Sequence, residues 1–260
     1  MRWSLIEPRL HLKRGRWSLF YLLLLYHGLF AQLPGTRQDY ADLFGRDYTF
    51  AAETLEKNSW WSDTLAAHGI DPVFALSVVF PELIRYSSMS DYIEIKALEV
   101  LYVQYGHEYA DFSVGLFQMK PSFAEQIEED VMQYHLTGRF PSLGLLNPDT
   151  AGDSQIRKER IARLQNEYGQ LLYLEAFLRI MDHIYRDVEF ENPESRLVFY
   201  STAFNTGYRK SEEVIRWESG QVYFYRGMTC TEVKHSYSDI AVEYYKKRMP
   251  GKNEKPARSQ

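Results

Sequence analysis

The sequence predicts a mainly helical domain with a small β-hairpin, and three observations lead to this fold class. Residues 153–186 repeat apolar side chains at the spacing of an amphipathic helix. Asp71 and Pro72 form a helix start before an apolar run, because Asp caps a helix and Pro fits its first turn. Residues 111–119 are a short β-prone stretch that holds Gly115. With 260 residues and 45% hydrophobic content, the chain can bury a sizeable core.

The N-terminus has the pattern of a secretory signal. A basic cluster at residues 13–16 precedes an apolar run, residues 17–30, which ends at the small residue Ala31. The run is about 14 residues long, short of the roughly 20 that span a bilayer. We therefore expect residues 1–31 to be a signal peptide and the protein to be exported. An uncleaved anchor and a buried N-terminal helix stay open as alternatives.

The first half of the domain is expected to contain several helices. Residues 32–70 predict one or two short ones, and residues 94–105 predict another. The apolar run at 73–85 predicts a buried helix. Pro81 lacks the N–H that a helix interior requires, so we expect this helix to kink or end there. Glu82 would then stand at a break in an apolar segment.

The second half predicts further helices over residues 121–133, 153–186, 193–205 and 237–248. The long pattern at 153–186 fits one helix or two. Residues 138–152 are rich in Gly and Pro and predict a loop. Gly207 is expected to close the helix before it. The polar tail at 251–260 is expected to be disordered.

Charge and cysteine content argue against several classes of function. The net charge is −5, and residues 1–31 carry five basic residues and one acidic residue, so the remainder carries −9. An acidic body argues against nucleic acid as a partner, because phosphate binding needs a basic surface. Cys230 is the single cysteine, and the histidines have no metal-ligand spacing. We therefore expect no metal and no cofactor.

Three separated segments carry polar side chains that predict a site. The first, residues 80–88, places Glu82 in an apolar run. A buried carboxylate is costly unless it is paired or protonated, and burial raises its pKa as a glycosidase acid requires. Pairing with Arg85 or helix capping would be a purely structural explanation. The second segment is Phe-Ser-Val-Gly-Leu-Phe-Gln-Met-Lys-Pro at 112–121, and the third is Phe-Tyr-Ser-Thr-Ala-Phe-Asn-Thr-Gly at 199–207.

In this order the segments resemble the lysozyme-like soluble lytic transglycosylases and their goose-type lysozyme relatives. That family has a catalytic Glu that ends a buried helix, a Gly-Ala-x-Gly-Leu-Met-Gln stretch with a downstream Pro, and an Ala-Tyr-Asn-Ala-Gly stretch. The matching positions here are Ser113, Gly115, Leu116, Gln118, Pro121, Ala203, Asn205 and Gly207. The resemblance covers about residues 71–250. It implies one lysozyme-like catalytic domain at 32–250, with the hairpin beside the active-site cleft.

The sequence also departs from the family pattern. Leu83 follows the Glu where the family has Ser, and Phe112, Phe117 and Phe204 replace the first Gly, the Met and the Tyr of the later motifs. The stretch between the first two segments is longer than is usual in the family. The pattern at 153–186 has the character of an insertion. Because of these departures, a lysozyme-like module without catalytic activity stays open as an alternative.

The resemblance implies cleavage of peptidoglycan between N-acetylmuramic acid and N-acetylglucosamine. Glu82 would act as general acid on the glycosidic oxygen and then as base on the muramyl 6-hydroxyl, which gives a 1,6-anhydro product. The residues implied in substrate binding are Ser113, Gln118, Met119, Tyr200, Asn205 and Tyr244. Tyr237 is the alternative to Tyr244 on the last helix.

Other readings of the same residues remain open. A hydrolytic lysozyme would need a second carboxylate, and the candidates Asp91, Glu94, Glu99, Glu108 and Asp111 stand at no motif position. An inactive module that binds glycan or serves as an envelope scaffold would be favoured if Arg85 engages Glu82. A helical structural protein would leave the three segments apart. Peptidoglycan is the expected partner, an envelope protein complex stays open as a second one, and the periplasm or cell envelope is the expected location.

Overall fold

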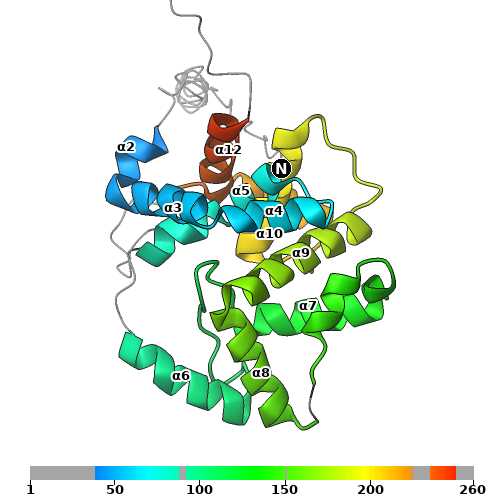
Figure 1. Ribbon diagram of the computed structural model, residues 1–260. Helices are drawn as coiled ribbons and strands as arrows, with labels where there is room; N and C mark the ends of the chain where they lie inside the picture. Colours follow the sequence, from blue (N-terminus) through cyan, green and yellow to red (C-terminus); the bar gives the residue numbers. More distant parts are fainter. Residues whose placement is uncertain (1–38, 88–91, 150, 223, 225–234, 250–260) are drawn as a thin grey trace, which may run out of the picture. The chain divides into compact units, whose positions relative to one another are not determined.

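Helices make up almost all of the regular structure (Figure 1). The computed structural model describes residues 39–87, 92–149, 151–222, 224 and 235–249. The predicted mainly helical class is confirmed in this part of the chain. The predicted signal peptide at 1–31 and the tail at 251–260 lie outside it. No helix among the described residues has the length and apolar character needed to cross a membrane.

From Tyr40 onward the chain forms one compact unit. Its elements are α2 (Tyr40–Phe44), α3 (Arg46–Lys57), α4 (Ser59–Ala67), α5 (Pro72–Ser87), α6 (Tyr92–Tyr105), α7 (Pro121–Gln133), η1 (Leu136–Gly138), η2 (Pro141–Leu146), α8 (Asp153–Gln165), α9 (Glu167–Ile184), α10 (Pro193–Thr206), α11 (Glu212–Ser219) and α12 (Tyr237–Arg248). The helices predicted before Pro72 number one or two, whereas α2, α3 and α4 are present. Helix α11 has no counterpart among the predicted helices.

The long pattern at 153–186 is two helices, α8 and α9. Asn166 between them has an extended backbone, and its side chain accepts a hydrogen bond from the Gly169 backbone N–H at 3.2 Å. This is a standard N-cap, because the amide oxygen satisfies an N–H that the first turn leaves free. The break is therefore set by one capping residue within a continuous apolar pattern.

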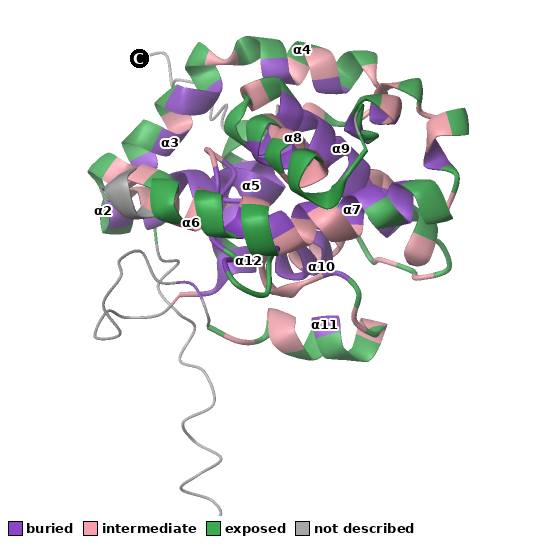
Figure 2. Ribbon diagram, turned by 90° about the horizontal axis from the view of Figure 1, so that it is seen from below, coloured by how far each residue is buried: buried purple, intermediate pink, exposed green. Residues whose placement is uncertain are grey.

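Helix α5 is at the centre of the core, where it packs against α3, α10 and α12. Its residues from Phe74 to Ile84 form an unbroken buried run, and Figure 2 shows α5 enclosed by its neighbours. Asp71 caps it as predicted, since its Oδ1 accepts from the backbone N–H of Val73 at 2.9 Å. Of the predicted kink or end at Pro81, the end is wrong, because the helix continues to Ser87. Packing on several sides compensates for the one hydrogen bond that the proline removes.

The predicted β-hairpin at 111–119 is not present, and the described residues contain no strand. A single antiparallel bridge joins Val114 to Met119, with the Val114 N–H donating to the Met119 carbonyl at 2.9 Å. Gly115 turns the chain at φ +71°, and a Cβ there would overlap the Gln170 side chain. The Phe117 N–H donates to Gln170 Oε1 at 2.7 Å. The loop therefore bonds to helix α9, which leaves no partner strand for a longer ladder.

An ionic cluster ties α6, α7, α8 and α9 together. Glu128 of α7 accepts hydrogen bonds from Arg160 and Arg163 of α8 and from the hydroxyl of Tyr173 on α9. Arg160 also donates to the Tyr102 hydroxyl of α6 at 2.6 Å. This half of the unit is therefore held both by apolar packing and by a buried network of ion pairs and hydrogen bonds.

Candidate functional site

Glu82 lies in the last turns of α5 and is only 3% exposed. Nη1 of Arg85, one turn further along, donates to both carboxylate oxygens at 2.8 Å. Tyr237, the first residue of α12, donates from its hydroxyl to the Val78 carbonyl at 3.0 Å, and the same hydroxyl lies close enough to the Glu82 carboxyl to lower its pKa. A hydroxyl has one proton, so Tyr237 can donate to only one of these acceptors at a time.

The electrostatics of Glu82 combine opposing influences. Burial raises the pKa of the Glu82 carboxyl, while the charge and hydrogen bonds of Arg85, the hydroxyl of Tyr237 and the charge of Lys120 lower it. Burial is the largest of these, so the pKa stands above its ordinary value despite the ion pair. Burial also raises the pKa of the Tyr237 hydroxyl well above its ordinary range, which keeps it protonated. The site can therefore hold a proton on Glu82 over a wider pH range than an exposed glutamate.

Asn205, from the third sequence segment, reaches the same neighbourhood through Tyr237. It lies at the end of α10, which Gly207 terminates at φ 102° as predicted. Asn205, Thr206 and Tyr237 line one narrow crevice of about 10 Å³, roughly the room that one water molecule needs. Tyr237 therefore lies near residues of two of the three segments.

The charge of Lys120, in the second segment, slightly lowers the pKa of the Glu82 carboxyl, while its ammonium group pairs with Asp111 at 3.7 Å. Gln118 is 8% exposed and holds the left-handed backbone conformation, φ 49°, that few residues other than Gly adopt. Its Nε2 donates to the Gly115 carbonyl at 2.8 Å, whereas its buried Oε1 has no partner among the described residues. Ser113 is half-buried and Met119 is buried. A strained residue with an unsatisfied acceptor is typical of a functional position.

Tyr200 and Tyr244 lie in the core, away from these contacts. The Tyr200 hydroxyl donates to Asp182 at 2.6 Å, and its ring packs edge-on against Phe74 near the start of α5. Tyr244 stacks on Phe80 with ring centroids 3.8 Å apart, and burial raises its pKa to about 12. Tyr237, the alternative considered from the sequence, is the tyrosine of α12 that contacts Glu82.

Three partners of Glu82 were not assigned to the substrate site from the sequence. Arg85 stands three positions after Glu82, which is the spacing of side chains on one helix face. Lys120 lies inside the second segment, next to Pro121, so its position was available from the sequence. Tyr237 could have been chosen over Tyr244 only with the packing of α12 against α5 in hand.

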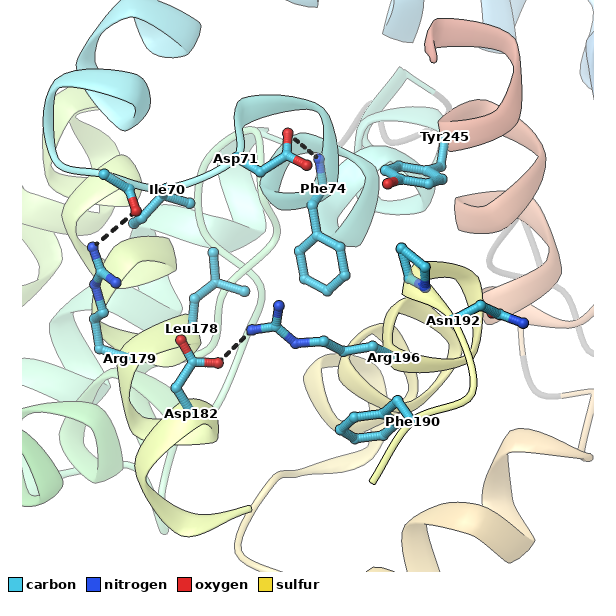
Figure 3. A pocket seen from close by; sticks show the side chains of 12 residues that line it. Ile70, Asp71, Phe74, Leu178, Arg179, Asp182, Phe190, Asn192, Arg196 and Tyr245 are labelled. Carbon is cyan, nitrogen blue, oxygen red and sulfur yellow. Dashed lines mark hydrogen bonds and ion pairs between the residues drawn. The ribbon is translucent and has the colours of Figure 1, made fainter. Parts of the chain in front are cut away.

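A cavity of about 580 Å³ lies at the opposite end of α5 (Figure 3). It is lined by residues that include Asp71 and Phe74 from the start of α5, Asp182 from α9 and Arg196 from α10. Eleven residues separate Asp71 from Glu82, which is about 16 Å along a helix. This cavity is therefore separate from the carboxyl of Glu82.

The described residues contain no group of three or more His, Cys, Asp or Glu side chains that could hold a metal ion. No protein-family model, curated protein or solved structure matches this chain. The chemistry of the site therefore has to be inferred from its own residues.

Proposed function

We propose that the protein is an exported lytic transglycosylase that cleaves peptidoglycan between N-acetylmuramic acid and N-acetylglucosamine. The observation that carries this proposal is the setting of Glu82. It is a buried carboxyl with a raised pKa, and it is contacted by Tyr237 and influenced by Lys120. The order of the three sequence segments supplies the substrate class. The periplasm or cell envelope is where this substrate occurs.

In the proposed reaction, Glu82 gives its proton to the glycosidic oxygen as the bond from that oxygen to the muramyl C1 breaks. The leaving N-acetylglucosamine thereby regains its hydroxyl. The ionised Glu82 then takes the proton of the muramyl 6-hydroxyl as that oxygen bonds to C1, which closes the 1,6-anhydro ring. Glu82 ends the cycle protonated, so one carboxyl serves both steps. The orphan Oε1 of Gln118 would accept a substrate N–H or hydroxyl, and Asn205 would bind a neighbouring polar group.

The ion pair with Arg85 favours a second candidate function. Arg85 holds both carboxylate oxygens, and its side chain is 24% exposed against 4% for Glu82. A glutamate held ionised in this way cannot act as an acid, so a module that binds glycan or serves as a scaffold without cleaving it is the alternative. For catalysis, Arg85 has to release the carboxyl when substrate arrives, and its partial exposure gives it room to turn toward solvent.

The test is a digest of purified peptidoglycan with wild-type protein and with Glu82→Gln, analysed by mass spectrometry of the released muropeptides. Glu53→Gln is the matched control, because Glu53 is exposed on α3 and pairs only with Lys57 among the described contacts. We expect anhydro-muropeptides from the wild type and the control, and at least about a 100-fold lower rate from Glu82→Gln.

Other outcomes would change the assignment. Products with free reducing ends that depend on Glu82 would indicate a hydrolytic lysozyme. If folded wild-type protein released nothing from several peptidoglycans but sedimented with them, the binding module would replace the enzyme. Cleavage that is unchanged in Glu82→Gln would remove Glu82 from the mechanism.

A further inference from the structure

The cavity at the start of α5 has the character of a ligand site. Its volume of about 580 Å³ falls in the range of small-molecule pockets. Its walls are mostly apolar and include Phe74, Leu178, Phe190 and Tyr245. Figure 3 shows two arginines among the lining side chains, Arg179 and Arg196, and Arg196 extends between Phe74 and Phe190.

Arg196 is held in one orientation by the residues around it. Its guanidinium lies over the Phe74 ring at 4.9 Å and over the Tyr200 ring at 4.8 Å. Its Nη2 donates to Asp182 Oδ1 and weakly to the Tyr200 hydroxyl. The side chain nevertheless remains 40% exposed. These contacts with described residues use Nη2, so the donors left for a ligand are Nε–H and Nη1. They lie on different edges of the guanidinium, so a ligand oxygen accepts from one of them.

The charges around the cavity favour a singly charged anion over a multiply charged one. Arg179 and Arg196 are balanced by Asp71 and Asp182, so the lining carries no net charge. A phosphate dianion would be repelled by the two carboxylates, whereas a single carboxylate matches the single charge of one arginine. Asp182 is already satisfied by Arg196 and the Tyr200 hydroxyl.

Asp71 supplies an acceptor on the wall opposite Arg196. Its Oδ1 caps α5 through the backbone N–H groups of Val73 and Phe74, and the residue is exposed. Its second oxygen can therefore accept from an amide N–H of a ligand. A charged donor on Arg196, an acceptor on Asp71 and apolar walls together match the end of a peptide chain, which has a carboxylate, an amide N–H and a side chain.

We infer that this cavity binds the free C-terminal carboxylate of a short peptide. The carboxylate accepts from Arg196, and the last side chain packs against Phe74 and Phe190. The site is independent of Glu82 and of the proposed cleavage reaction. The same chemistry has two sources, the stem peptide of peptidoglycan and the C-terminus of another peptide or protein, and the experiment distinguishes them.

The experiment measures the fluorescence anisotropy of labelled peptides added to the full chain. The probes are Ala-Ala-Phe with a free carboxylate, the same peptide as a C-terminal amide, and a peptidoglycan stem tetrapeptide that ends in D-Ala. We expect each free carboxylate to bind at least about 10-fold more tightly than the amide, because a charge-assisted hydrogen bond is lost. Tighter binding of the stem peptide would identify peptidoglycan as the source, and tighter binding of Ala-Ala-Phe would identify another peptide.

Variants locate the binding in this cavity. Arg196→Lys keeps the charge and the pairing with Asp182 but loses the planar guanidinium, and we expect it to lower the affinity for the carboxylate about 10-fold and to leave the affinity for the amide unchanged. Arg186→Lys is the matched control, since Arg186 is an exposed arginine outside the cavity. Glu82→Gln should bind the peptides as the wild type does.

Three results would each overturn the inference. One is equal affinity for the carboxylate and the amide in the wild type, which needs no variant to interpret. Another is unchanged carboxylate binding in folded Arg196→Lys. The third is that neither free-carboxylate peptide binds to the folded wild-type protein.

Discussion

Two buried glutamates, Glu82 and Glu128, both face arginine, yet their surroundings differ. Glu128 accepts from Arg160 Nε and Nη2 at 2.9 and 2.6 Å, from Arg163 at 3.0 Å and from the Tyr173 hydroxyl. Its four donors match the roughly four lone-pair sites of a carboxylate. Glu82 has one nitrogen of Arg85 across both oxygens and a hydroxyl that it shares with a backbone carbonyl.

The difference indicates different roles for the two carboxyls. Glu128 is fully satisfied and joins three helices, so it has no capacity left for a ligand and serves the fold. Glu82 is buried with fewer partners, and burial therefore dominates its pKa. Incomplete satisfaction of a buried group costs stability and is retained at sites where the group has chemistry to perform.

The largest expected effect is the loss of stability in Glu128→Gln. Removing this carboxylate breaks a buried ion pair with two arginines and leaves Arg160 with Glu125 at 2.8 Å and Arg163 with Glu159 at 3.9 Å as their acidic partners. We expect a loss of about 3 kcal/mol in the free energy of unfolding. Glu82→Gln should lose less than about 1 kcal/mol, because its one cation, Arg85, can turn to solvent. Urea denaturation of both variants measures the contrast. Equal losses would mean that Glu82 is as structural as Glu128.

Arg85→Gln should have an intermediate effect on stability and a distinct effect on activity. We expect about 1–2 kcal/mol of destabilisation at neutral pH, since Glu82 loses a charged hydrogen bond but can take up a proton instead. Arg85 lowers the pKa of Glu82. Its removal should therefore shift the alkaline limb of the curve of cleavage rate against pH to higher pH. Arg85→Lys, which keeps the charge, should move it less. An unmoved limb would show that another group controls it.

Tyr237→Phe should have a smaller effect, about 1 kcal/mol of stability, because one hydrogen bond to Glu82 or Val78 is lost. The hydroxyl lowers the pKa of Glu82, so the alkaline limb should again move to higher pH. Tyr244→Phe is the matched control on the same helix, and it should leave the limb in place. The comparison of pH profiles, with unfolding curves alongside, separates Tyr237 from a merely structural tyrosine.

The sequence was sufficient for the fold where a signal was local. Asp71 predicts the start of α5, and Gly207 predicts the end of α10, because both act through their own backbone neighbourhood. Pro81 was misleading, since its local preference for a break is outweighed by packing from α3, α10 and α12. The prediction of a hairpin failed for a related reason. The loop at 112–119 hydrogen-bonds to Gln170, a residue far away in sequence.

The site residues show the same distinction between local signals and long-range contacts. Glu82 could be chosen from the sequence because a carboxyl in an apolar run is unusual on its own. Tyr237 could not be separated from Tyr244, because both lie on α12 and both contact α5, Tyr237 through the Val78 carbonyl and Tyr244 through the Phe80 ring. For Tyr200, too, the sequence could not show that its hydroxyl donates to Asp182, a residue of another helix.

The smallest expected effect is a pH-dependent gap in stability between wild type and Glu82→Gln. A raised folded-state pKa means that the folded protein keeps the Glu82 proton at pH values where the unfolded chain has lost it. Ionisation of Glu82 therefore costs folded-state stability as the pH rises from the ordinary value of 4.5 through the raised pKa. Because Gln has no proton to lose, the variant should gain on the wild type across this window and level off above it. Urea denaturation between pH 4 and 8 measures the gap, with Glu53→Gln as the exposed control. If the variant instead became less stable relative to the wild type as the pH rises, the Arg85 ion pair would outweigh burial, and Glu82 would then resemble Glu128 after all.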